Sequence, residues 1–139
     1  MSETAKVLYT GRTRTTGGRE NGAARSSDGR LDVRLSTPGS ARIGTNPEQL
    51  LAAGWSACLE SAIALAARKR EIVLPEAVSI DAEVDLHVAD GGSFISARFN
   101  ISMPGVERGV ARALVDAAHE NCPYSKATRG NVEVAINLV

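Results

Sequence analysis

The sequence has 139 residues, of which 43% are hydrophobic, so it can form one packed domain and is unlike a disordered chain. Its 16 basic and 16 acidic residues balance, and this pattern indicates neither a nucleic-acid nor a membrane partner. Residues 1–6 lack the apolar core of a signal peptide, which favours a cytoplasmic location. Because thiols are kept reduced there, two cysteines are more often catalytic or plain thiols than a structural disulfide.

The first third of the chain carries strand and turn patterns. Val7–Thr10 predicts a short strand, and residues 13–25 are polar and Gly-rich, which is typical of a strand edge or a loop. Asp28-Gly29 is a hairpin turn signal. Apolar residues alternate with charged ones over residues 31–35, which predicts another strand.

A long helix follows. Asn46 can cap it, Pro47 suits its first position, and it can run to about Arg70. Residues 50–67 contain a single charge, Glu60, and have a length near the lower limit of a membrane span. A charge in the middle of a span is costly, so we expect the helix to be buried inside protein. One small sheet cannot cover it all, which leads us to expect a homodimer.

Apolar spacing predicts the remaining elements. They are a strand at 78–88, a strand at 95–103, a helix at 106–120, a short loop after Cys122 and a strand at 132–138. The order is β-β-β-α-β-β-α-β. This pattern is typical of an α+β fold, here a single domain over residues 1–139 with the long helix packed on a mostly antiparallel sheet.

The two cysteines allow several interpretations. Cys58 lies inside the long helix among small neighbours, and Cys122 follows the second helix. Each could be a buried small hydrophobe, and a structural disulfide between them is a second alternative. A metal site would use these two residues with His87 and His119, yet the chain has no CxxC or HxxxH pair, so we expect no metal.

Reduction of a peroxide by a thiol is the interpretation that asks for specific partners. The thiolate attacks, so the pKa of the cysteine must fall below about 8.5. A guanidinium lowers it and can hold the peroxide, and a carboxylate can orient that guanidinium. A second thiol condenses with the sulfenic acid that the attack leaves. Spacing alone does not identify which arginine acts. Taken alone, Arg19 would be interpreted as a solvated loop residue and Glu48 as an acid in the first turn of a helix.

Three blocks of the sequence resemble the organic hydroperoxide resistance (Ohr) proteins of the OsmC-like superfamily. They are TTGGR at Thr15–Arg19, NPEQLLAAGWSAC at Asn46–Cys58 and AHENCPYSKATRGN at Ala118–Asn131. The blocks occur in the family's order, and the likeness covers essentially the whole chain. The Cys-Pro-Tyr-Ser segment favours the Ohr branch over the OsmC branch.

The resemblance implies a role for four residues. Cys58 matches the peroxidatic cysteine and Cys122 the resolving one, while Arg19 would stabilise thiolate and peroxide and Glu48 would orient Arg19. The family reduces organic hydroperoxides, including those of fatty acids, to alcohols through a Cys58–Cys122 disulfide, which a lipoylated protein or dithiol reduces. The implied fold is the OsmC/Ohr-like intertwined homodimer with active sites at the interface, and no cofactor or metal is required.

The chain departs from the family pattern next to Cys58. Leu51 and Leu59 stand where phenylalanine is common, and Trp55 where tyrosine is common. We expect these three residues to shape the substrate pocket. The alternative function is a non-enzymatic redox sensor or a small-ligand-binding dimer of the same fold, and turnover with a dithiol reductant would distinguish it from a peroxidase.

Overall fold

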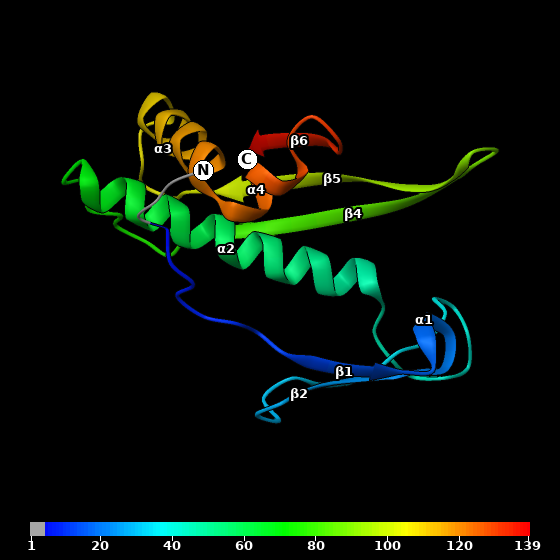
Figure 1. Ribbon diagram of the computed structural model, residues 1–139. Coiled ribbons are helices and arrows are strands. Elements are labelled where there is room, and N and C mark those ends of the chain that lie inside the picture. The colour runs from blue at the N-terminus through cyan, green and yellow to red at the C-terminus, as the bar shows by residue number, and fades with distance from the viewer. Residues whose placement is uncertain (1–4) are drawn as a thin grey trace. The chain divides into compact units, whose positions relative to one another are not determined.

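The computed structural model describes residues 5–139, and by its contacts the chain divides into two compact units. Unit 1 ends at Pro47, and unit 2 comprises Glu48–Val139. The elements follow one another as β1-α1-β2-β3-α2-β4-β5-α3-α4-β6 (Figure 1). This α+β order contains the predicted elements after residue 12, together with two additional short helices. That both units form one domain stays a prediction.

Unit 1 contains a small antiparallel sheet in the order β1-β2-β3. Its strands are Thr13–Thr16, Ala23–Ser26 and Asp32–Arg34, and the four-residue helix α1, Gly18–Asn21, joins the first two. The predicted turn at Asp28-Gly29 is confirmed: Gly29 has a φ of 75°, and the Asp28 carboxylate accepts from the Ser26 hydroxyl at 2.6 Å. The strand expected at residues 7–10 was wrong. Val7, Leu8 and Tyr9 are largely exposed and lie in no strand, so apolar character there was not a sign of burial.

Unit 2 contains the second sheet, in the order β4-β5-β6. Strands β4, Ser79–Ala89, and β5, Gly92–Ser102, are antiparallel over their whole length. Strand β6, Glu133–Leu138, runs parallel to β5, so the sheet is mixed where the sequence suggested a mostly antiparallel one. Helix α3 is the crossover that returns the chain for this parallel pairing.

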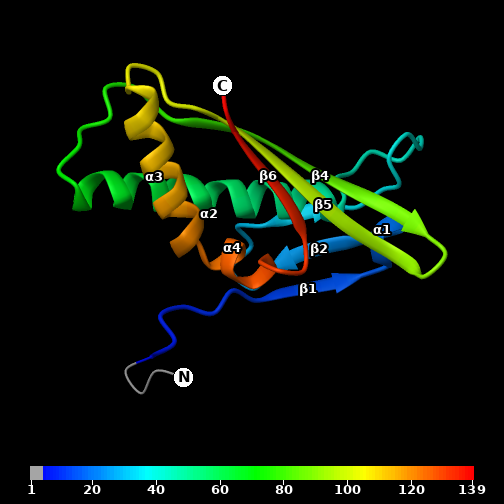
Figure 2. The same cartoon turned by 90° about the horizontal axis from the view of Figure 1, so that it is seen from above.

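Three helices accompany this sheet. They are α2, Pro47–Lys69, α3, Arg108–Asn121, and α4, Pro123–Thr128. Figure 2 shows α3 crossing α2, with the long strands β4 and β5 beside both. Helix α4 was expected as a loop because its six residues are too few for a periodic pattern, although Pro123 at its first position is a helix-start signal.

The core of unit 2 joins these helices to one face of the sheet. Its fully buried side chains come from α2, β5, α3 and the residue after α3, namely Trp55, Leu59, Ile63, Phe99, Ile101, Leu114, Val115, Ala118 and Cys122. The rings of Trp55 and Phe99 meet edge to face with centroids 4.8 Å apart. The other face of the sheet is polar, and there Arg98 donates to Glu83 and Asp85. The alternation in the first half of β4 therefore separates a partly buried apolar face from a charged one.

Helix α2 is apolar on more sides than this core covers. By length and composition it could cross a membrane, yet a buried helix of a soluble protein passes the same test. Its most apolar 18-residue window is 28% buried within the chain. Residues Ala53, Ala57, Ser61 and Leu65, spaced four apart, form an exposed stripe. This stripe is the exposed face in the apolar middle of α2.

Candidate active site

Cys58 is positioned by the packing of α2. Trp55 precedes it by nearly one helical turn and Leu59 follows it, and both of those side chains are fully buried. Cys58 itself is half-buried and packs against the core. The helix therefore fixes the direction of the Cys58 side chain while leaving its sulfur partly accessible.

Cys122 lies at the junction of two helices. Its backbone N–H donates to the carbonyl of Ala118 at 2.8 Å and so ends α3, while its carbonyl accepts from the N–H of Lys126 at 2.9 Å and begins α4. Its own backbone is extended, with φ −63° and ψ 124°. The side chain is fully buried. Cys122 is thus held by hydrogen bonds on both sides, although it belongs to neither helix.

The two thiols face each other, and both are free of disulfide bonds. Burial raises the pKa of the Cys58 thiol above its ordinary value, and a hydrogen bond with Cys122 and the charge of that group act in the same direction. The backbone N–H of Tyr124 lowers the same pKa because it stabilises the thiolate. These surroundings therefore favour the neutral thiol, and a nearby cation would make Cys58 a better nucleophile at neutral pH.

A chain of three polar side chains lies next to the cysteines. The Trp55 indole N–H donates to the Ser125 hydroxyl at 3.2 Å, and the Ser125 hydroxyl oxygen lies 2.9 Å from Nδ1 of His119. Ser125 is fully buried. The guanidinium of Arg129 donates to the backbone carbonyl of His119 at 2.7 Å. We call the three side chains Trp55, Ser125 and His119 the indole–imidazole bridge.

The other predicted catalytic residues lie at element starts. Glu48 is in the first turn of α2, in unit 2. Arg19 is half-buried in α1, in unit 1, directly after Gly17 and Gly18. Both glycines have positive φ, and a side chain on Gly17 would come within 2.8 Å of the Gly22 backbone, so this turn requires glycine. Contact of Arg19 or Glu48 with the thiols stays a prediction.

The three expected pocket residues differ in exposure. Leu51 is half-buried at the margin of the core, whereas Trp55 and Leu59 have no exposed surface. A hydroperoxide would touch these two only after neighbouring side chains moved. Their part in shaping the pocket stays a prediction, and in this conformation their contribution is packing behind Cys58.

The histidines considered as metal ligands have other partners. His87 Nε2 lies 2.8 Å from the Ser96 hydroxyl, and its ring stacks on Phe94 at a centroid distance of 4.6 Å. His119 is part of the indole–imidazole bridge. Within residues 5–139, the His, Cys, Asp and Glu side chains form no group of three that could hold a metal ion.

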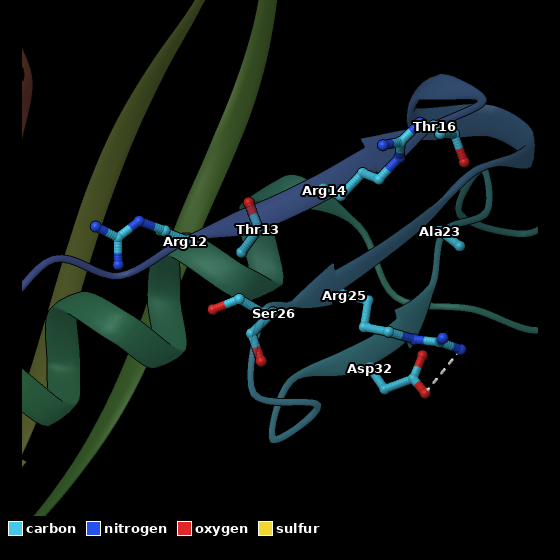
Figure 3. A pocket seen from close by; sticks show the side chains of 9 residues that line it. Arg12, Thr13, Arg14, Thr16, Ala23, Arg25, Ser26 and Asp32 are labelled. Atoms are coloured by element: carbon cyan, nitrogen blue, oxygen red, sulfur yellow. Dashed lines mark ion pairs between the residues drawn. The ribbon is translucent and has the colours of Figure 1, made fainter.

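A hollow of about 410 Å³ lies in unit 1 and was not predicted (Figure 3). Its lining includes Arg12, Arg14 and Arg25 together with threonine and serine hydroxyls, and Asp32 is its one carboxylate. Arg25 and Asp32 form an exposed ion pair at 3.3 Å. The overall charge balance gave no sign of this cluster of arginines. The cluster forms because strand pairing sets Arg14 directly opposite Arg25. The lining favours anions over cations.

Comparison with known proteins identifies the family. The model of the family described as OsmC-like protein matches residues 37–137. An organic hydroperoxide resistance protein of Xanthomonas axonopodis pv. citri is 46% identical over 142 residues, covering 99% of each chain. The chain belongs to the Ohr proteins of the OsmC-like family. The predicted family is confirmed, and so is the α+β OsmC/Ohr-like fold of the chain, while the homodimer stays a prediction.

Solved structures of Ohr proteins have the same fold. The crystal structure of OhrB of Bacillus subtilis has a TM-score of 0.89 and 40% identity, covering 96% of this chain and 100% of that one. An Ohr protein from Legionella pneumophila also has a TM-score of 0.89, with 42% identity and 96% and 98% coverage.

The sequence reasoning missed two contributors to this Ohr site. The first is Ser125, and the second is the amide of Tyr124, which stabilises the Cys58 thiolate. His119 had been considered only as a metal ligand. A signal was present, since His119, Cys122 and Ser125 are spaced three apart. Such spacing alone does not predict the contact, because the backbone is extended at Cys122 and the break between α3 and α4 brings Ser125 to His119.

The titration of His119 tests the geometry around Ser125. Burial and the charge of Arg129 lower its pKa below the ordinary value of 6.5, while Asp116 and Glu120 act in the opposite direction. Because the unfolded state then binds more protons, stability should decline as pH falls from 6.5 through the lower folded-state pKa, and level off below it.

NMR of the imidazole carbon protons gives the midpoint, and urea unfolding at a series of pH values gives the stability. His119→Asn should remove this part of the pH dependence. A His119 midpoint at or above 6.5 would contradict the burial described for it.

Proposed function

We propose that the protein is a thiol-dependent peroxidase that reduces organic hydroperoxides to alcohols, with Cys58 as the attacking residue and Cys122 as the resolving one. The observation that carries the proposal is the facing pair of free thiols in unit 2. One is half-buried on α2, and the other is fully buried between α3 and α4. Membership of the Ohr proteins, whose printed names refer to organic hydroperoxides, supports the choice of substrate.

The unequal exposure of the thiols supports the division of roles. A hydroperoxide has to reach the attacking sulfur from outside, and Cys58 is the cysteine with exposed surface. A resolving thiol has to reach only the other sulfur, so the complete burial of Cys122 is compatible with that role. Burial also protects Cys122 from direct oxidation.

The proposed reaction has three steps. The Cys58 thiolate attacks the outer oxygen of the hydroperoxide, the O–O bond breaks, and the alkoxide leaves and is protonated to the alcohol, while Cys58 becomes a sulfenic acid. The Cys122 sulfur then attacks the Cys58 sulfur. The S–S bond forms, the S–O bond breaks, and oxygen leaves as water. A dithiol such as a lipoyl group finally reduces the disulfide and is itself oxidised.

The first step needs a cation, since the surroundings of Cys58 in unit 2 raise its pKa. In the proposal this cation is Arg19, which Glu48 orients and which also stabilises the leaving alkoxide. A cytoplasmic location belongs to the proposal as well, because that compartment keeps both thiols reduced between turnovers. Metal and organic cofactors have no part in these steps.

Substituting the cysteines separates the steps. Cys58→Ser should abolish turnover of cumene hydroperoxide with dihydrolipoamide, and Cys122→Ser should allow one reaction and then stall at a sulfenic or more oxidised Cys58. Steady-state rates and the intact mass after one equivalent of peroxide measure these outcomes. Full turnover by Cys58→Ser would refute the assignment. Rapid reaction of the unaltered protein without regeneration by dithiol would instead support a redox sensor.

Substituting Arg19 tests the source of the cation. In a Cys122→Ser background, the pH dependence of iodoacetamide alkylation reports the pKa of Cys58 alone. Arg19→Ala should raise this pKa and slow the reaction with peroxide by at least about tenfold, and Arg19→Lys should recover only part because lysine lacks the planar guanidinium. Arg14→Ala, a second arginine of unit 1, is the matched control. An alkylation curve unchanged by Arg19→Ala would remove Arg19 from the mechanism.

We further propose that the active protein is an intertwined homodimer. The exposed stripe of α2, Ala53, Ala57, Ser61 and Leu65, supports this because it is apolar or small and lies on the same helix as Cys58. Small residues allow a second helix to approach closely, and burying the stripe against another copy would remove apolar surface from water. In the proposal, residues of both subunits complete each active site.

Light scattering tests the dimer. The unaltered protein should have twice the mass of one chain at micromolar concentration, and Leu65→Arg should shift it toward the monomer because a buried, unpaired charge is costly. Val73→Arg is the control, since Val73 is 88% exposed in a loop. A monomeric unaltered protein would defeat the proposal.

A further inference from the structure

The indole–imidazole bridge connects the segments that carry the two cysteines. Trp55 lies on α2, three residues before Cys58. His119 lies in the last turn of α3, three residues before Cys122, and Ser125 lies in α4, three residues after it. The bridge therefore ties the helix of one sulfur to both sides of the other. The peroxide chemistry proposed above uses none of its three side chains.

The protons in the bridge follow from the chemistry of its members. An indole N–H can only donate, so the Ser125 oxygen accepts from Trp55 at 3.2 Å. The Ser125 hydroxyl proton then needs an acceptor, because this side chain is fully buried. Nδ1 of His119, at 2.9 Å, supplies it when the imidazole is neutral and carries its proton on Nε2. The lowered pKa of His119 is in agreement with a neutral ring.

We propose that His119 is a positioning residue that acts through Ser125 and Trp55 to keep the Cys122 sulfur within reach of the Cys58 sulfur. Without the Nδ1 acceptor, the buried hydroxyl of Ser125 loses a partner and the link between α2 and the α3–α4 junction weakens. The hydrogen bond from Arg129 to the His119 carbonyl holds the backbone of the same turn.

The catalytic consequence rests on the proposed function and concerns the second step of the reaction. Once Cys58 is a sulfenic acid, two reactions compete for it. The Cys122 thiol can condense with it and release water, or a second hydroperoxide can oxidise it to a sulfinic acid and leave as an alcohol. Close placement of Cys122 favours the first route. The bridge would therefore protect the enzyme from inactivation without changing the first attack.

The first experiment needs no peroxide. Equilibration of the Cys58–Cys122 pair with mixtures of reduced and oxidised glutathione, read by alkylation and intact mass, gives the effective concentration of the two thiols toward each other. His119→Ala and Ser125→Ala should lower this value by about tenfold, in the range expected for the loss of a buried hydrogen-bond partner. His119→Asn should stay within about twofold of the unaltered protein, because its amide oxygen can replace Nδ1. Glu120→Ala, an exposed neighbour outside the bridge, is the matched control.

The second experiment measures how the Cys58 sulfenic acid divides between disulfide formation and oxidation to sulfinic acid. After excess cumene hydroperoxide without reductant, His119→Ala and Ser125→Ala should show several-fold more sulfinic acid on Cys58 at equal peroxide concentration. The rate of the first attack should stay within about twofold, and His119→Asn should restore the low sulfinic fraction. Circular dichroism confirms that each variant is folded. If His119→Ala does not fold, His119→Asn and His119→Gln are compared instead, because the longer glutamine places its amide away from the Nδ1 position.

The inference would be overturned if His119→Ala and Ser125→Ala had the same effective thiol concentration and the same sulfinic acid fraction as the unaltered protein. Equal behaviour of the asparagine and glutamine variants would also overturn it. A protein that does not react with hydroperoxides at all would refute the proposed function. In that case the glutathione equilibrium would still decide whether the bridge positions the two thiols.

Discussion

Helix α2 buries Trp55 and Leu59 against β5 and α3, and the placement of Cys58 depends on this contact. The edge-to-face packing of Trp55 on Phe99 fixes the rotation of α2 about its axis, so Cys58 points toward the α3–α4 junction. Truncating a large core side chain typically costs about 2–5 kcal/mol. A change at this contact would therefore alter stability and thiol geometry together, and variants that act only on geometry have to leave the packing surface in place.

The electrostatics of unit 2 oppose the chemistry proposed for it. Burial and the neighbouring thiol raise the pKa of Cys58, and the Tyr124 amide compensates only in part. A thiol protected in this way resists unselective oxidation until a cation approaches. Supplying that cation from Arg19, on a glycine-flanked turn of unit 1, would make activation depend on how the units meet. Under this proposal, Cys58 is neither a freely exposed thiol nor a thiolate at all times, so it reacts only when Arg19 is in place.

The sequence predicted the features that depend on local pattern and missed those that depend on packing. The start of α2 at Pro47 and the strands β4 and β5 follow from capping and alternation, and the structure confirms them within a few residues. The strand at residues 7–10 was wrong because a short apolar run does not by itself indicate burial. Trp55 and Ser125 are 70 residues apart, so their hydrogen bond became visible only with the fold. The roles of Cys58 and Cys122 as a pair came from the family motifs, because local pattern does not show which distant residues lie together.

The position of Cys122 is compatible with the proposed reversible disulfide of a buried thiol. A disulfide requires Cα atoms about 4.4–6.8 Å apart and a restricted torsion, which two residues in rigid helices rarely satisfy by chance. Cys122 has extended backbone angles between two helices, and hydrogen bonds to Ala118 and Lys126 hold it from both sides. The break frees the side chain from helical geometry, while the flanking bonds and the indole–imidazole bridge limit how far it can move. If Cys122 is the resolving cysteine, as proposed, its place at the break between two helices lets its sulfur approach Cys58 while the flanking hydrogen bonds limit its movement.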